Sequence, residues 1–204
     1  MSNHIKDYRD SLLPEIKFKG RKVCVLTNYR TGSTFFIRET FLSNRIIPMG
    51  DWEHFNNNKS FKFLLDELKQ RTAFVFKLMP DQIKLDEAKF NDILGECDEI
   101  VYLYRRDFEA QARGWIAWNM AGDHDHHYGE LKRYDINITQ EVADKYCQEL
   151  IDNYNFMNKS FKKFPGNVYC LEDFPIQVPY SRIYNWQNQI VIPNFNTHKQ
   201  VFRT

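Results

Sequence analysis

Short apolar runs alternate along the chain with longer segments in which apolar residues recur every three or four positions. The runs are rich in Val, Ile, Phe and Tyr and lie at Lys22–Thr27, Ala73–Met79, Glu99–Tyr104 and Asn167–Leu171. Runs of this length and composition are typical of strands that are buried on both faces of a sheet. The pattern therefore predicts four buried strands.

The segments between these runs have the spacing of amphipathic helices. Helical spacing is found at Ser33–Asn44, Phe61–Leu68, around Phe90–Leu94, from Asp107 to about Asn119 and at Thr139–Phe164. Strands that alternate with helices predict right-handed β-α-β units and a mainly parallel sheet covered on both faces. The expected fold class is therefore α/β, a three-layer α/β/α arrangement. A chain of 204 residues suits one core, so we expect a single domain over residues 1–204.

The overall charge gives no general electrostatic signal. A net charge of +1 and a pI near 7.7 do not favour binding to nucleic acid or to an anionic membrane. No stretch has the length and apolarity of a signal peptide or a membrane span, which predicts a cytoplasmic protein. The four cysteines form no C-x-x-C pair, so reduced thiols are expected, with neither a disulfide nor a zinc site. Any anion binding must be local.

Candidate chemistry appears directly after the first strand, where the chain reads Arg30-Thr31-Gly32-Ser33-Thr34 before the first helical segment. The first N–H groups of a helix have no partner inside the helix, and the peptide dipoles make that end partly positive. Gly32 permits close approach of a ligand, the hydroxyls are donors, and Arg30 adds a permanent charge. The pattern favours a phosphate-like anion, and the alternative is an ordinary capped turn between a strand and a helix.

The loop differs from the nucleoside triphosphatase motif, G-x-x-x-x-G-K followed by Ser or Thr, because Ser33 stands at the Lys position and Thr27 at the first Gly. It resembles instead the first loop of sulfotransferases that use 3′-phosphoadenosine 5′-phosphosulfate (PAPS). That loop has a Lys or Arg, a Ser or Thr, a Gly and two further hydroxyl residues, and the version here is most similar to the bacterial carbohydrate branch. The resemblance implies a P-loop-like fold similar to that of nucleotide kinases.

A second element carries the same resemblance. After the third strand the chain reads Arg105-Arg106-Asp107 and continues with Gln111, Ala112 and Trp115, in register with the segment that binds the 3′-phosphate in that branch. The departure is Gly114, which stands where the family has a Ser that also contacts this phosphate. Arg113 could compensate as a second cation. The alternative is that these arginines are solvated charges at a helix end.

The resemblance also suggests the residues of the transfer step. Glu53, in the loop after the first helix, matches the family's acceptor of the hydroxyl proton, and the neighbouring His54 is the rival base because its intrinsic pKa is suitable. The alternative is that neither takes part. Arg30 and the backbone of Thr31 to Thr34 are expected to offset charge on the sulfuryl oxygens and on the leaving phosphate. Lys77 ends the second strand and is expected to hold the sulfuryl oxygens or the acceptor, or else to cap the strand.

Two further stretches contain candidate residues. Pro193–Lys199 resembles the family segment that closes over the nucleotide, which adds Lys199 to the expected nucleotide-binding residues. Asp123-His124-Asp125-His126-His127 is the one stretch that suggests a metal, but ligands usually come from rigid elements, so a loop facing the acceptor is favoured and no metal is expected.

Together these residues imply a sulfotransferase that moves a sulfuryl group from PAPS to a hydroxyl of a carbohydrate or other small acceptor. Two alternatives remain at this point. A P-loop-type kinase would share the fold but needs the missing loop Lys and a magnesium-binding Asp. A catalytically degenerate module that binds nucleotide or a partner is favoured by Gly114 and by the short chain.

Overall fold

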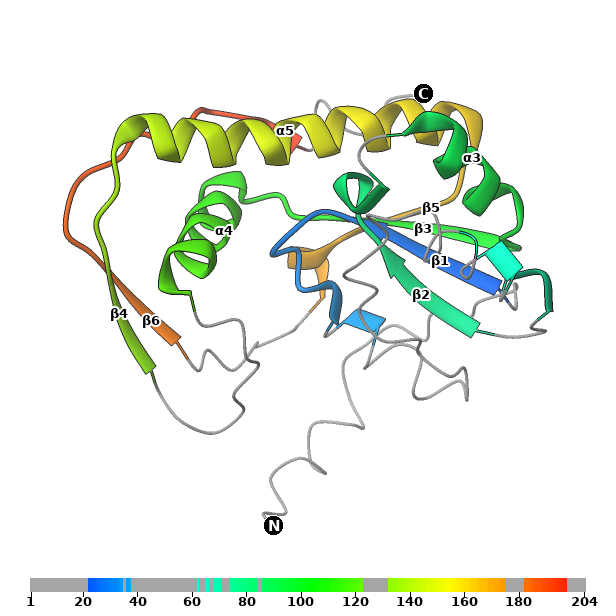
Figure 1. Ribbon diagram of the computed structural model, residues 1–204, viewed down its shortest axis with the longest axis horizontal. Helices are drawn as coiled ribbons and strands as arrows, with labels where there is room; N and C mark the ends of the chain where they lie inside the picture. The colour runs from blue at the N-terminus through cyan, green and yellow to red at the C-terminus, as the bar shows by residue number, and fades with distance from the viewer. Residues whose placement is uncertain are drawn as a thin grey trace, which may run out of the picture.

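A computed structural model shows a four-stranded, wholly parallel central sheet with the strand order β2-β1-β3-β5 (Figure 1). Its strands are β1 (Lys22–Thr27), β2 (Phe74–Leu78), β3 (Glu99–Tyr104) and β5 (Asn167–Cys170). The structure describes residues 22–34, 36–37, 62, 65–66, 68–70, 74–83, 86–122, 132–174 and 182–197. Within these ranges, all four predicted strands are confirmed.

The helices of the described ranges begin where the sequence supplies capping residues. They are α3 (Glu87–Gly95), α4 (Phe108–Ala121) and α5 (Gln140–Lys163), with short 3-10 turns η2 (Pro80–Ile83) and η3 (Leu171–Asp173). Asp86, Asp107 and Thr139 each accept a hydrogen bond from a backbone N–H of the first turn that follows. The long helix α5 stops just before Pro165, as predicted. No helix in the described ranges is long and apolar enough to cross a membrane.

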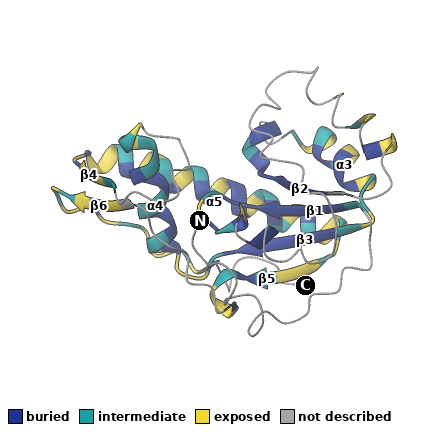
Figure 2. Ribbon diagram, turned by 90° about the horizontal axis from the view of Figure 1, so that it is seen from below, coloured by how far each residue is buried: buried dark blue, intermediate teal, exposed yellow. Residues whose placement is uncertain are grey.

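Side chains alternate along each strand, so each strand sends apolar residues to both faces of the sheet. Both faces are covered by other segments. Cys24 and Leu26 of β1 belong to one core, which α3, α4 and α5 complete. Val23 and Val25 point the other way and pack with Phe36, in the helical segment that follows β1. Figure 2 shows β1, β2 and β3 largely buried, whereas the beginning of β5 is exposed. The architecture is α/β with helices on both sides of a parallel sheet.

A second, smaller sheet was not predicted. It pairs β4 (Lys132–Ile136) with β6 (Arg182–Trp186) in parallel, and it lies beside α4 and the beginning of α5 (Figure 1). Residues of β4 alternate between partly buried and exposed, with only Ile136 fully buried. A strand of this kind has no apolar run, so the pattern that identified the central strands did not identify this pair.

The strand order fixes where a ligand site is expected. β1 is central, with β2 on one side and β3 on the other, so the chain leaves the carboxyl ends of β1 and β3 in different directions. Crevices of α/β sheets open at such a switch point, outside the carboxyl ends of the strands. The loop after β1, which begins at Asn28, and the loop after β3, which begins at Arg105, flank this point.

Candidate anion-binding site at the carboxyl edge of the sheet

The loop after β1 turns through two residues with a left-handed backbone. Arg30 and Gly32 have φ values of 55° and 72°, both in the left-handed region. The helical segment begins at once, since the N–H of Phe36 donates to the carbonyl of Gly32 at 2.9 Å. A Cβ at Gly32 would lie 2.8 Å from Cδ1 of Leu171. Glycine is favoured here by its positive φ, and a larger residue would also have to displace the tip of the Leu171 side chain.

Polar side chains inside the loop fix its shape. The Thr31 hydroxyl is buried and donates to the carbonyl of Asn28 at 2.9 Å, and it also meets the hydroxyl of Thr27. The amide of Asn28 donates to the Leu150 carbonyl of α5 at 2.8 Å, while its oxygen accepts from the N–H of Tyr29 at 2.8 Å. Thr31 thus shapes the loop from within, while Thr34 is exposed at the beginning of the helical segment.

Lys77 reaches this loop from the neighbouring strand. Its side chain is only 8% exposed, and Nζ donates to the Thr34 hydroxyl at 3.3 Å. Val75, two residues earlier in β2, packs in the same core as Phe36, so Lys77 points to the face that the helical segment covers. The structure brings the cation of β2 to the beginning of that segment.

Arg105 joins the two loops that flank the switch point. Its Nη1 donates to the backbone carbonyl of Arg30 at 3.3 Å. Its Nε lies 3.6 Å from a carboxylate oxygen of Glu172, and the side chain is 20% exposed. Residues that lie 75 positions apart along the chain are thus in contact, and a second guanidinium stands beside the loop after β1.

A buried network behind these loops was not predicted. Gln111 of α4 is fully buried and donates to the carbonyl of Tyr29 at 2.6 Å. The Tyr154 hydroxyl of α5 donates to the side-chain oxygen of Gln111 at 2.7 Å and accepts from the N–H of Arg105 at 3.3 Å. Burial raises the pKa of Tyr154, so the phenol stays a neutral donor. Tyr154 lies in the helical segment predicted at Thr139–Phe164, and the helical spacing gives no sign of this bond.

Glu172 holds the beginning of α4 against the end of β5. Its two carboxylate oxygens accept from the N–H groups of Arg106 at 2.9 Å and Asp107 at 3.1 Å. Burial alone would raise the pKa of Glu172, but these bonds and one from the Cys170 thiol outweigh it and lower that pKa. The carboxylate therefore remains charged at neutral pH beside Arg105.

Tyr29 faces the opposite side of the loop, toward α4. Its ring stacks on Trp115 with centroids 3.7 Å apart and an angle of 7° between the planes. Trp115 is only 7% exposed and is part of the core. The Tyr29 hydroxyl donates to Oδ2 of Asp81, whose pKa is raised by burial and by the nearby Glu149 charge.

The remaining predicted residues lie elsewhere. Arg113 points to the segment after β6: it pairs with Glu109 at 2.9 Å, donates to the Ile190 carbonyl at 3.4 Å and lies over the ring of Trp186. The predicted bases Glu53 and His54, the closing residue Lys199 and the stretch 123–127 lie outside the described residues. Within the described ranges, His, Cys, Asp and Glu side chains form no metal-binding group of three or more.

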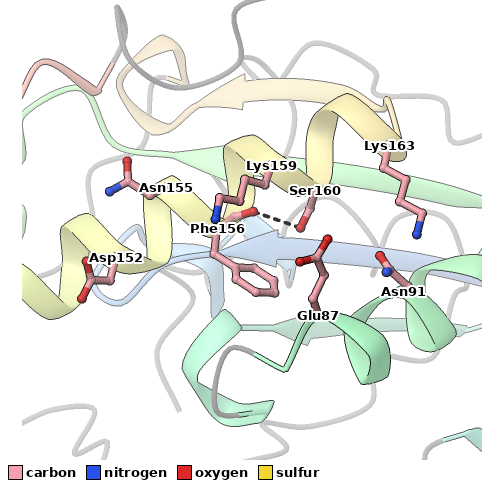
Figure 3. Close-up of a pocket in the computed structure, with 8 residues that line it drawn as sticks. All are labelled: Glu87, Asn91, Asp152, Asn155, Phe156, Lys159, Ser160 and Lys163. Atoms are coloured by element: carbon pink, nitrogen blue, oxygen red, sulfur yellow. Dashed lines mark hydrogen bonds between the residues drawn. The ribbon is translucent and has the colours of Figure 1, made fainter.

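One hollow of the structure is separate from this edge. A pocket of about 400 Å³ lies between α3 and α5, and Figure 3 shows Glu87, Lys159 and Lys163 around it, with the ring of Phe156 also in its lining. It contains acids and bases together and none of the loop residues, so it shows no preference for an anion.

The chain was compared with models of protein families and with curated proteins. Neither comparison finds a match. The candidate site therefore stands on its own geometry: two loops and a strand-end lysine that converge at the carboxyl edge of a parallel sheet.

Proposed function

We propose that this protein is a PAPS-dependent sulfotransferase with a P-loop-like fold, acting on a hydroxyl of a carbohydrate or another small acceptor. The observation that carries the proposal is the contact between Arg105 Nη1 and the carbonyl of Arg30, at 3.3 Å. It unites the loops after β1 and β3, which are the two segments whose residues resemble the donor-binding elements of these enzymes. Both segments lie at the switch point where α/β sheets bind nucleotides.

The arrangement of cations favours a nucleotide with two separate anionic groups. Lys77 reaches the beginning of the first helical segment, whereas Arg105 stands at the beginning of α4. A triphosphate site instead concentrates its charge on one loop with an internal Lys, and residue 33 here is Ser. The donor of a sulfotransferase has a 5′-phosphosulfate and a 3′-phosphate. These two anionic groups match the two separate cations, Lys77 and Arg105.

The proposed chemistry is in-line transfer of the sulfuryl group. The acceptor oxygen forms a bond to sulfur while the bond from sulfur to the bridging phosphate oxygen breaks, and the nucleotide leaves as the 3′,5′-bisphosphate. Lys77 and the N–H groups of residues 32–34 stabilise charge on the sulfuryl oxygens and on the leaving phosphate. Glu53, with His54 as the rival base, accepts the proton of the acceptor hydroxyl.

A non-catalytic role is the second candidate, and one feature favours it. Gly114 stands where the resembling enzymes have a Ser that contacts the 3′-phosphate. A chain that retained the nucleotide site but lost turnover would bind the bisphosphate and transfer nothing to any acceptor. Donor binding and turnover must therefore be measured separately.

The decisive experiment is calorimetric titration with adenosine 3′,5′-bisphosphate, with ADP plus magnesium as the comparison. Arg105→Ala is expected to weaken bisphosphate binding roughly tenfold or more, since a hydrogen bond to a charged group contributes about 1.5–3 kcal/mol. Arg106→Ala is the matched control, because Arg106 has the same charge next in the chain but pairs with Asp173 at 2.6 Å.

Each outcome has a defined meaning. Bisphosphate binding that Arg105→Ala weakens and Arg106→Ala preserves supports the donor site and justifies an acceptor screen with PAPS. Binding of ADP with magnesium, and none of the bisphosphate, would reject the sulfotransferase in favour of a kinase. Bisphosphate binding without transfer to a broad set of hydroxyl acceptors would favour the non-catalytic module.

A further inference from the structure

The side chain of Arg30 does not extend toward Lys77 but lies across α4 at Gly114. A Cβ built on Gly114 would be 3.7 Å from Nε of Arg30 and 3.8 Å from its Cβ and Cγ. The stem and the beginning of the guanidinium of Arg30 therefore run over the glycine surface of the helix. We propose that Arg30 and Arg105 together hold the 3′-phosphate of the donor, and that Gly114 makes room for Arg30 to do so. This inference rests on the proposed function.

The backbone at the beginning of α4 is not free to bind that phosphate. Glu172 already accepts from the N–H groups of Arg106 and Asp107, and the Asp107 carboxylate accepts from the N–H of Ala110 at 2.9 Å. A second anion there would face two carboxylates. The charge of a phosphate at this position must therefore be matched by side chains, and arginine is well suited because its forked donors bind phosphate oxygens in pairs.

Arg30 and Arg105 lie where they can supply this side-chain charge, and Arg113 does not. The guanidinium of Arg105 donates to the backbone carbonyl of Arg30, so its tip lies at the base of the Arg30 side chain. Arg113 was the sequence-based candidate for a compensating cation. Its partners, however, are Glu109, the Ile190 carbonyl and the ring of Trp186, all on the side toward β6. Arg30 thus occupies the helix surface where the resembling enzymes carry their Ser hydroxyl.

The two faces of the sheet indicate which cation binds which anionic group of the donor. Lys77 points to the face covered by the helical segment after β1, whereas α4 packs on the other face through Ala112 and Trp115. Arg30 and Lys77 therefore stand on opposite sides of the loop backbone. Lys77 serves the 5′-phosphosulfate, and Arg30 serves the 3′-phosphate beside Arg105.

The test compares two nucleotides that differ only in the 3′-phosphate: adenosine 3′,5′-bisphosphate and adenosine 5′-monophosphate. In calorimetric titrations of the wild type, the bisphosphate should bind at least roughly tenfold more tightly. Arg30→Ala should lose most of that preference by weakening the bisphosphate alone, and the monophosphate should change less than about twofold. Arg106→Ala removes the same charge from a paired neighbour and should preserve the preference.

A pair of variants at Gly114 provides an independent test that leaves the charge of Arg30 in place. Gly114→Ala adds a Cβ at ordinary contact distance, so Arg30 keeps its position and the preference for the bisphosphate remains. Gly114→Val adds branched methyl groups on the same surface and should displace Arg30, with the same selective loss as Arg30→Ala. This pair remains informative even when Arg30→Ala fails to fold, as judged by circular dichroism.

The experiments distinguish a failure of this inference from a failure of the proposed function. Equal weakening of both nucleotides by Arg30→Ala would place Arg30 at the 5′ end, which overturns this inference and leaves the sulfotransferase proposal intact. An unchanged preference in both Arg30→Ala and Gly114→Val also overturns it. A wild type that binds neither nucleotide would reject the proposed function and this inference together.

Discussion

Among single residues, Asp81 is half-buried and has an incomplete hydrogen-bond set. It follows β2 directly, in η2, and accepts from the Tyr29 hydroxyl through Oδ2. Its Oδ1 is buried and has no hydrogen-bond partner in the part of the chain that the structure describes. Burial, followed by the nearby charge of Glu149, raises the pKa of Asp81 above 3.8 in the folded state.

This pKa shift predicts how stability changes with pH. The unfolded chain releases the Asp81 proton at lower pH than the folded chain, so Asp81 lowers stability as the pH rises from about 4 toward its folded-state pKa. Asp81→Asn keeps a carbonyl acceptor for Tyr29 and removes the charge. We expect the variant to be more stable than the wild type at pH 7 and to lose that advantage at pH 3.

Denaturant unfolding of both proteins between pH 3 and pH 7 checks this expectation. Asp92→Asn removes the same charge from an exposed position of α3 and should change stability little at any pH. If the gain from Asp81→Asn were the same at pH 3 and pH 7, ionisation of Asp81 would not be its cause.

The sequence predicts the position of a site residue when that residue stands at a fixed place relative to a predicted strand. Lys77 and Arg105 follow or end apolar runs, and the carboxyl ends of parallel strands share one edge, so their convergence with the loop could be predicted. The course of Arg30 over Gly114 could not, because it depends on how α4 docks. Nor could the bond between Tyr29 and Asp81, which are 52 positions apart and share no periodic pattern.

At the scale of elements, the same distinction holds. β1 and β3 were predicted to the residue because each is a dense apolar run with both faces buried. β4 and β6 pair in parallel between segments 50 positions apart, with polar residues on their open face. Their stability depends on the neighbouring helices α4 and α5. The pattern of apolar residues within β4 and β6 does not predict these contacts.

The pairing of β5 with β3 depends on one glycine at its beginning. A Cβ on Gly166 would lie 2.1 Å from the carbonyl oxygen of Ile100, a backbone atom of β3 that cannot move alone. Gly166→Ala must therefore push the beginning of β5 away from the sheet. We expect the free energy of unfolding to fall by about 2–3 kcal/mol, at the upper end of the range for overpacked sites.

Gly95→Ala is the matched control for this prediction, measured in the same denaturant series. Gly95 is the last residue of α3, and a Cβ there would meet nothing within 4 Å. It should leave stability unchanged or raise it by up to about 1 kcal/mol, since Ala is the better helix former. A Gly166→Ala variant as stable as Gly95→Ala would show that β5 can shift at little cost.

At the scale of the whole molecule, the candidate site exists only when the sheet is assembled. Thr34, Lys77 and Arg105 come from three separate segments, and the unfolded chain does not bring them together. The net charge of +1 gives the unfolded chain no general attraction for anions. A ligand of this site must therefore bind the folded state selectively and stabilise it by mass action.

Adenosine 3′,5′-bisphosphate should accordingly raise the melting temperature. At a concentration one hundred times its dissociation constant it adds about 2.7 kcal/mol, or about 5–10 °C for a chain of this size. Arg105→Ala should need a higher concentration for the same rise, and adenosine, which has no phosphate, should give none. A rise of equal size with adenosine would mean that stabilisation comes from the base and ribose, and that the cations at the carboxyl edge of the sheet do not bind the ligand.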